Sequence, residues 1–278
     1  MNLFESTFVI WLGAIAAGFV GSLTGLGGGF IVVPMLTLLF GVDIRYAIGA
    51  SLVSVIATSS GAAAAFVREG FSNIRIGMLL EVATTIGALI GAGLALHIPT
   101  SAIAVVFGVV LLQSAYLSSR KQADHPFTGP PDVWAARLRL NGDYPTAEGM
   151  KSYRVKNIAG GFGLMGVAGV LSGLLGIGSG AVKVLAMDQI MRVPFKVSTA
   201  TSNFMIGVTA AASAGIYLSR GYIEPALAMP VMLGVLTGSL VGAKILFKIR
   251  TRLLRKVFAI IILLLGLQLI YKGLTGGM

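Results

Sequence analysis

The chain has 278 residues, of which 56% are hydrophobic and only 11% charged. Soluble domains carry roughly a quarter of charged residues, so this composition excludes an ordinary soluble protein and predicts a multi-span α-helical membrane protein. The chain contains no cysteine, which excludes disulfides and thiolate metal sites. The net charge of +11 does not indicate nucleic-acid binding, because the basic residues gather in the segments that connect the apolar stretches.

Five apolar stretches follow one another in the first part of the chain. They lie at about 7–25, 30–40, 46–67, 75–97 and 101–118. The last three are long enough to cross a bilayer, whereas the second holds about 11 residues, or about 16 Å of helix, which is half a membrane. We therefore expect the first two to be arms of a broken or re-entrant helix that meet at a glycine-rich tip.

The segment 119–156 is the one sizeable polar piece. Prolines and a glycine between Asp124 and Pro131 predict a loop. The β-leaning runs 137–141 and 152–155 suggest a small hairpin around Gly142 and Asp143. The segment is expected to be a solvated linker between the two copies, with a regulatory or partner-binding role as the alternative. The expected division is a first membrane repeat at 1–118, a cytoplasmic linker at 119–156 and a second membrane repeat at 157–278.

The second part of the chain repeats the first. Shifted by 151 positions, Gly18 falls on Gly169 and Gly87 falls on Gly238 without a gap. The corresponding apolar stretches are 157–176, 181–191, 197–218, 224–247 and 254–272. An internal duplication in so apolar a chain is typical of secondary transporters whose halves enclose a site between them.

The basic residues predict how the repeats are oriented. Each copy crosses the membrane an odd number of times, so the second copy should be inverted. Most of the 21 lysines and arginines lie in the linker and in 68–75, 191–196 and 248–256, whereas the opposite side holds Arg45, Arg220 and Lys272. By the positive-inside rule the linker is cytoplasmic and both termini face outward, in a multi-pass protein of the inner membrane.

Two glycine-rich tips precede the half-length stretches, GLGGG at 25–29 and GIGSG at 176–180. Glycine allows close approach of a substrate or another backbone. The unpaired first amides of the following helix carry about half a positive charge. Two opposed helix ends predict an anion site near the midplane, although tight helix packing is the alternative. The candidate tip residues are Gly27, Gly28, Gly29, Phe30, Gly178, Ser179, Gly180 and Ala181.

Two ionisable residues stand in apolar surroundings. Lys183 lies in the first turn after the second tip, where the first copy has Val32. An intramembrane lysine suggests a functional role, with a bound anion as its partner. The alternatives are an ion pair with Asp188 or Glu81, or a snorkelling side chain. Glu81 is a candidate coupling residue, a candidate partner for Lys183, or a residue near the interface.

Hydroxyl and amide side chains repeat in the third stretch of each copy. Such groups suit hydrogen bonding to an oxyanion along a path, or they serve helix contacts and back-bonds to their own helix. The candidate lining residues are Ser51, Ser54, Thr58, Thr201, Ser202 and Asn203. Thr209 repeats Thr58 in the second copy.

At these motifs the chain resembles the TauE/SafE family of sulfite exporters, over nearly all of 8–272. The resemblance rests on GLGGGFIVVP at 25–34, GIGSGAVKV at 176–184 and ATSNFMIGVTAAA at 200–212. It implies export of sulfite, sulfonates or related small organic anions. The chain departs from the family at Ser179, usually glycine, and at Leu185, commonly proline.

Taken together, the residues predict a secondary transporter for a small anion that works by alternating access and is coupled to an ion gradient. An anion channel, or a membrane anchor without transport, remains the alternative. The two histidines, His97 and His125, form no catalytic constellation, so we expect no enzyme, no metal and no cofactor. The expected partners are the anion and the lipid bilayer but no nucleic acid, and homo-oligomerisation stays open.

Overall fold

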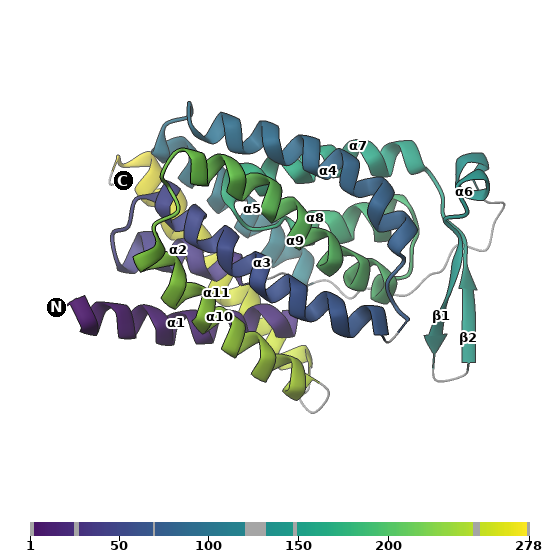
Figure 1. Ribbon diagram of the computed structural model, residues 1–278, viewed down its shortest axis with the longest axis horizontal. Helices are drawn as coiled ribbons and strands as arrows, with labels where there is room; N and C mark the ends of the chain where they lie inside the picture. Colours follow the sequence, from purple (N-terminus) through teal and green to yellow (C-terminus); the bar gives the residue numbers. More distant parts are fainter. Residues whose placement is uncertain are drawn as a thin grey trace.

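The computed structural model describes residues 3–24, 28–68, 70–119, 132–146, 149–246 and 251–276 (Figure 1). The first repeat forms α1 (Leu3–Thr24), α2 (Gly29–Leu39), α3 (Ile44–Arg68), α4 (Ile74–Ala95) and α5 (Thr100–Ser119). The predicted stretches match these helices to within a few residues, because each apolar run ends at a glycine, a proline or a polar loop. The expectation of an all-α membrane protein is confirmed in this mostly helical fold.

The second repeat forms α7 (Ile158–Leu175), α8 (Gly180–Leu185), α9 (Phe195–Ser219), α10 (Pro225–Leu246) and α11 (Thr251–Leu274). A π-helical turn, η1 (Ala186–Ile190), continues α8, so the two together make the predicted half-length stretch. In the first repeat the equivalent helix α2 contains Pro34 instead. Both half-length helices therefore carry an irregularity, and π-helical turns are frequent at functional sites.

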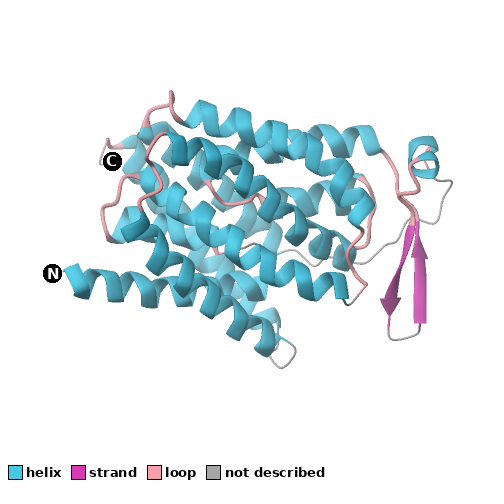
Figure 2. Cartoon of the chain, in the orientation of Figure 1, coloured by secondary structure: helices cyan, strands magenta, loops and turns pink. Residues whose placement is uncertain are grey.

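The linker contains a short helix and a hairpin. After α6 (Val133–Arg137), strand β1 (Gly142–Thr146) pairs antiparallel with β2 (Gly149–Tyr153), with Gly142 opposite Tyr153 (Figure 2). The expected hairpin is therefore present, but its strands were misplaced: the run 137–141 precedes β1, and the run 152–155 overlaps β2 only at Ser152 and Tyr153. Asp132 caps α6 by accepting a hydrogen bond from the Trp134 amide, and the end of this helix at Arg137 and the turn after it take up most of the run 137–141. The loop predicted between Asp124 and Pro131 lies outside the described residues.

Helices pair across the two repeats rather than within them. The main pairs are α1 with α10, α4 with α7, α3 with α9 and α5 with α11. A Cβ added to Gly18 would lie 2.2 Å from the Val235 carbonyl oxygen, and one added to Gly169 would lie 2.1 Å from that of Thr84. The same shift that carries Gly18 to Gly169 carries Thr84 to Val235, so the contact between α1 and α10 is repeated between α7 and α4.

The pairs also differ in direction. Helices α3 and α9 run antiparallel, because Gly49 of α3 faces Tyr222 while Gly207 of α9 faces Ser59. Helices α1 and α10 run parallel, as do α4 and α7. Helices that occupy the same place in the two repeats and are in contact, such as α3 and α9, therefore run antiparallel. Helices that occupy different places in the two repeats, such as α1 and α10, run parallel.

These pairings divide most of the helices into two interlocked bundles. The first bundle contains α1, α2 and α3 with α10, which packs against α1 and α3. The second bundle contains α7, α8 and α9 with α4, which packs against α7 and α9. Each repeat thus lends its fourth stretch to the other, and the bundles meet along α3 and α9.

The two ends of the molecule differ. Helix α1 begins and α11 ends at one end, and the hairpin lies at the other (Figure 1). At the hairpin end the Lys156 amide donates to the Met191 carbonyl, and Arg75 donates to the Arg139 carbonyl. Three of the basic regions that the charge pattern assigned to one side therefore lie together.

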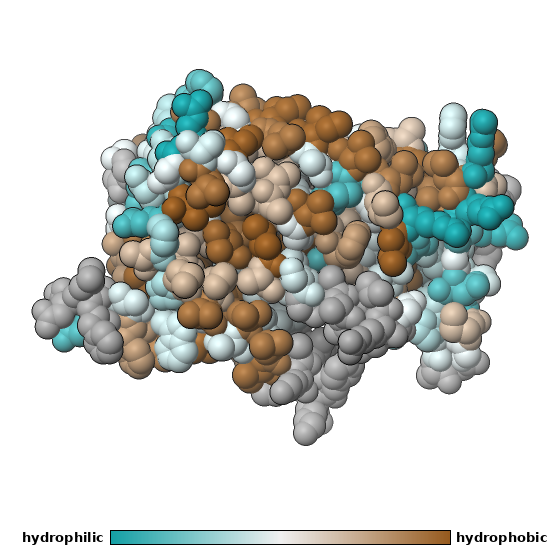
Figure 3. Space-filling view, in the orientation of Figure 1, coloured by the Kyte–Doolittle hydropathy of each residue, from teal (hydrophilic) through white to brown (hydrophobic). Residues whose placement is uncertain are grey.

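Apolar side chains cover the body between these ends. Hydrophobic surface dominates there, and hydrophilic residues gather at the hairpin end and at the opposite end (Figure 3). Within the described residues, Ile74–Ala95, Ile158–Leu175 and Pro225–Gly242 are long and apolar enough to cross a membrane. Helix α4 faces outward with Met78, Val82, Ile86, Leu89 and Ile90.

Candidate functional site

The two tips meet inside the molecule. Gly29, the first residue of α2, lies so close to the second tip that an added Cβ would be 3.1 Å from the Gly176 carbonyl oxygen and 3.2 Å from Cα of Ile177. The Ser51 hydroxyl of α3 donates to the same Gly176 carbonyl, at 2.8 Å. Gly28 and Phe30 are buried beside this contact, whereas Gly27 lies outside the described residues.

The second tip turns through left-handed backbone. The φ angles are +67° at Gly176, +70° at Gly178 and +48° at Ser179. Gly178 lies between Ile206 of α9 and Val55 of α3, with an added Cβ 2.6 Å from Cγ2 of Ile206. Both contacts fall near the middle of α3 and α9, so the tip inserts between the bundles at mid-height.

Helix α8 carries Lys183 into a closed polar cluster. The side chain is fully buried, and Nζ donates a hydrogen bond to the Thr209 hydroxyl of α9. Glu81 of α4 places its Oε2 atom 4.0 Å from Nζ. The ion pair considered from the sequence is therefore present, and snorkelling of Lys183 was wrong because no part of the side chain reaches solvent.

Glu81 is held from two sides and is itself 8% exposed. The Thr209 hydroxyl donates to its Oε1 atom at 2.7 Å, and Thr85, one turn along α4, donates to the same atom at 3.2 Å. Its Oε2 atom is buried and has no hydrogen-bond partner. The alternative partner, Asp188, lies in the π-helical turn and is partly exposed.

Four of the candidate hydroxyls fall into two groups. Ser51 and Ser202 donate to tip carbonyls, at Gly176 and Gly180 respectively. Ser54 and Thr58 donate to carbonyls of their own helix, which is one of the two alternatives that their sequence pattern allows.

The remaining lining candidates make other contacts. The Thr201 hydroxyl accepts a hydrogen bond from the backbone amide of Asn73. The side-chain amide of Asn203 donates to the Thr199 carbonyl. At the second tip Ser179 is fully buried and its hydroxyl has no partner within the described residues, whereas the side chain of Ala181 is not described.

Sequence reasoning missed the role of Thr209 and Thr85. In the sequence Thr209 stands out only as the repeat of Thr58, and nothing in the spacing reveals that it joins Lys183 to Glu81. The cluster has no equivalent in the other bundle, where Val32 and Met232 occupy the positions of Lys183 and Glu81. The charged site is therefore built into one bundle of an otherwise repeated fold.

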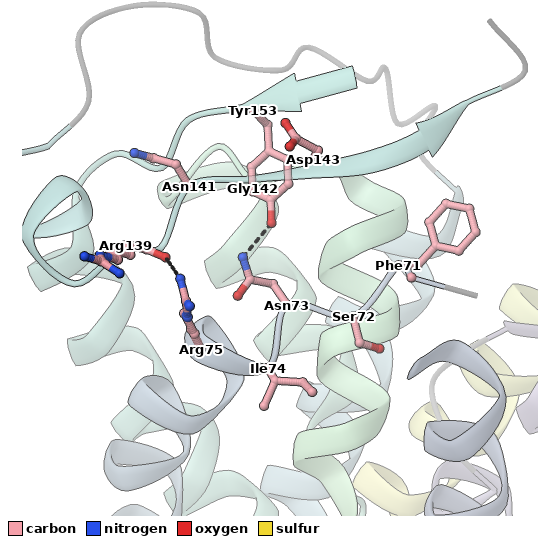
Figure 4. A pocket seen from close by; sticks show the side chains of 11 residues that line it. Phe71, Ser72, Asn73, Ile74, Arg75, Arg139, Asn141, Gly142, Asp143 and Tyr153 are labelled. Carbon is pink, nitrogen blue, oxygen red and sulfur yellow. Dashed lines mark hydrogen bonds between the residues drawn. The ribbon is translucent and has the colours of Figure 1, made fainter. Parts of the chain in front are cut away.

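A second polar site lies at the hairpin end. A cavity of about 300 Å³ is lined by residues of the α3–α4 loop, of the first turn of α4 and of the linker, among them Asn73, Arg75 and Tyr153 (Figure 4). The Asn73 side chain donates to the Tyr153 hydroxyl at 2.7 Å and to the Leu140 carbonyl at 3.0 Å. Burial raises the pKa of Tyr153 to about 12, although the hydrogen bond from Asn73 acts in the opposite direction.

Comparison with known proteins shows the family of this chain. Residues 10–269 match the family model described as sulfite exporter TauE/SafE. The chain belongs to the TauE/SafE family. The resemblance seen at the two tips is thus confirmed over nearly the whole chain.

Relatives of this TauE/SafE chain carry transporter names. This chain is 29% identical over 273 residues to the probable membrane transporter protein YunE of Bacillus subtilis, and the alignment covers 96% of this chain and 97% of the relative. It is 25% identical over 266 residues to the probable membrane transporter protein MJ0441 of Methanocaldococcus jannaschii, covering 90% of each. No solved structure matches this TauE/SafE chain.

Proposed function

We propose that this chain is a secondary transporter that exports a small anion, such as sulfite, a sulfonate or a related organic anion, across the cytoplasmic membrane. The family match and the names of the relatives support a membrane transporter. The substrate class is argued from the site. Within the described membrane body, Lys183 is a fully buried cation at a helix beginning, which is where an anion is best stabilised.

The observation that carries this proposal is the arrangement of donors on the second tip. Lys183 follows Ser179 by one helical turn, and the Ser179 hydroxyl is buried without a protein partner. Buried polar groups normally have hydrogen-bond partners, so an unsatisfied hydroxyl one helical turn before a buried lysine suits a ligand with negatively charged oxygens. The first tip adds the α2 beginning at Gly29, and Glu81 remains the coupling candidate.

Alternating access is supported by the repeated contacts. The first helix of each repeat packs against the fourth stretch of the other repeat, α1 against α10 and α7 against α4. Helices α3 and α9 run antiparallel, as expected of inverted repeats. Because the bundles exchange α4 and α10, we propose that the bundles, rather than the sequence halves, rock about the tips. The fully enclosed Lys183 then corresponds to an occluded arrangement.

The charge pattern supports a cytoplasmic position for the hairpin end. The basic regions 68–75, 137–156 and 191–196 belong to this end, and positive charge is retained on the cytoplasmic side. Both termini would then face outward from the inner membrane.

The test is flux into proteoliposomes of sulfite, sulfoacetate, thiosulfate and plain carboxylates, with and without a pH gradient. We expect saturable anion flux in the natural protein, loss of flux in Lys183→Ala and unchanged flux in Lys196→Ala, which removes an exposed lysine. Flux that does not respond to any ion gradient would indicate a channel. No flux of any anion would favour a membrane anchor and would refute the proposal.

A further inference from the structure

We propose that Glu81 binds one proton for each anion that binds Lys183, so that the protein moves anion and proton together and the sum of their two gradients sets the direction of transport. Thr209 is the switch that links the two events. This inference rests on the proposed transport of anions, and it specifies the coupled ion and the stoichiometry. It follows from three features of the cluster formed by Lys183, Glu81, Thr209 and Thr85.

The first feature is that Glu81 already occupies the position of an anion. Its Oε2 atom lies 4.0 Å from Nζ of Lys183, and both side chains are buried. With Glu81 ionised the pair is neutral overall. A second anion entering this cluster would leave an uncompensated negative charge away from water, which is strongly unfavourable. A proton on Glu81 removes that charge and leaves Lys183 to pair with the substrate.

The second feature is the unpartnered oxygen of Glu81. Thr209 and Thr85 both donate to Oε1, whereas Oε2 is buried without a hydrogen bond. A proton on Oε2 therefore displaces no existing donor. It removes the negative charge that faces Lys183 and adds an O–H donor there, so the carboxyl no longer forms an ion pair with the ammonium group.

The third feature is the position of the Thr209 hydroxyl. It has a single proton and two acceptors within reach, Oε1 of Glu81 at 2.7 Å and the Met205 carbonyl at 2.9 Å. It accepts from Lys183 in either case. When Glu81 is ionised the proton points to the carboxylate. When Glu81 is protonated and moves away, the proton turns to the carbonyl, so Lys183 keeps one partner while it binds the anion.

Other titratable groups stand apart from this cluster in the described structure. Helix α7, which packs on α4, contains no titratable side chain and presents glycines. Helix α9 has Lys196 and Tyr217 towards its two ends, and Asp188 lies beyond Lys183 in the π-helical turn. Lys183 and Glu81 are thus the charged pair at the centre.

The experiment uses isethionate, a small sulfonate whose charge does not change near neutral pH, because sulfite itself gains a proton there. The purified full-length protein in liposomes is assayed for isethionate flux and for internal pH with a trapped dye. We expect one proton to accompany each anion, and flux to be insensitive to a membrane potential set with potassium and valinomycin.

Glu81→Gln mimics the protonated carboxyl. In this variant we expect isethionate flux to persist without proton movement, to lose its pH dependence and to follow the membrane potential. Glu224→Gln, which changes an exposed acid, should keep the natural coupling. Thr209→Ser should retain coupling, whereas Thr209→Val should lower flux at least tenfold.

The outcomes separate the two proposals. Isethionate flux without protons in the natural protein, or intact coupling in Glu81→Gln, overturns proton coupling and leaves anion transport standing. If Glu81→Gln does not fold, intact coupling in Thr209→Val overturns the switch. If no anion moves in the natural protein while the protein remains folded, anion transport itself fails, and proton coupling fails with it.

Discussion

Lys183 and Glu81 face each other with 4.0 Å between Nζ and Oε2, although one belongs to the second repeat and the other to a helix that the first repeat lends to it. The pair exists only because α4 crosses into the second bundle. A buried ion pair of this kind is weak evidence for stability, since hydrophobic residues of similar volume often stabilise as much. We therefore attribute the position of this pair at the centre of the fold to the proposed binding role rather than to stability.

Replacing one member of this pair should lower the stability more than replacing both members. Lys183→Met leaves Glu81 buried and unpaired, and we expect a loss of about 3–5 kcal/mol. The double variant Lys183→Met with Glu81→Met should recover most of that loss while remaining unable to transport anions. Thermal unfolding in detergent measures the stability, and liposome flux measures the activity. Equal stability of the single and double variants would contradict the pairing.

Close packing between α4 and α7 should depend on Gly169. Gly169→Ala places a Cβ about 2 Å from the Thr84 carbonyl oxygen, which forces the helices apart, and overpacking costs about 1–3 kcal/mol. Gly163→Ala on the same helix meets no atom within 4 Å and is the matched control. We expect a lower melting temperature in the first variant alone. The equivalent Gly18→Ala should behave like Gly169→Ala if the repeated contact is real.

The shape of the second tip should matter for transport. Gly178 combines a φ of +70° with a neighbour, Ile206, that an added Cβ would approach to 2.6 Å. Gly178→Ala should therefore reduce anion flux at least tenfold. Gly221→Ala, at a φ of +75° in open space, carries the backbone strain of about 1–2 kcal/mol without the clash. Similar flux in both variants would show that strain, rather than shape, decides the outcome.

The hairpin should detach when Asn73 is truncated. Asn73→Ala removes hydrogen bonds to the Tyr153 hydroxyl and to the Leu140 carbonyl and also removes the cap of α4, which alone is worth about 1 kcal/mol. We expect faster proteolysis between 138 and 156. Tyr153→Phe removes one of these bonds and keeps the ring, so its cleavage rate should lie between those of the natural protein and Asn73→Ala.

The titration of Tyr153 offers a pH test of the same contact. Burial raises its pKa to about 12, above the ordinary value of 10.0, so the folded state favours the protonated phenol. This contribution to stability is complete below about pH 10 and is lost as the pH rises towards 12. Ultraviolet absorbance, compared with Tyr153→Phe, should assign one tyrosine to this late titration. Ionisation near pH 10 would show that the hairpin is undocked.

Much of the fold could be predicted from the sequence because apolar runs and glycines determine helix ends locally. The half-length stretch after each tip was predicted from its length alone. The hairpin itself was predicted, but its strands were misplaced, because the β-leaning run 137–141 falls on the end of α6, which Asp132 caps, and on the turn after it.

The site was predicted only in part. Lys183 and Glu81 stood out because charge is rare in apolar stretches, and their contact was one of several alternatives. Thr209 could not be assigned, because its importance depends on which helices are neighbours. Spacing along one helix says nothing about a partner on another, and Ser54 and Thr58 accordingly proved to bond to their own helix.

The exchange of α4 and α10 also limits how this protein can be divided. A fragment ending at the linker would contain α4 without α7, and the complementary fragment would contain α10 without α1. Neither piece could cover the glycine-lined faces of its donated helix by itself. The two pieces should therefore persist in cells only when made together, although each contains all five segments of its own repeat.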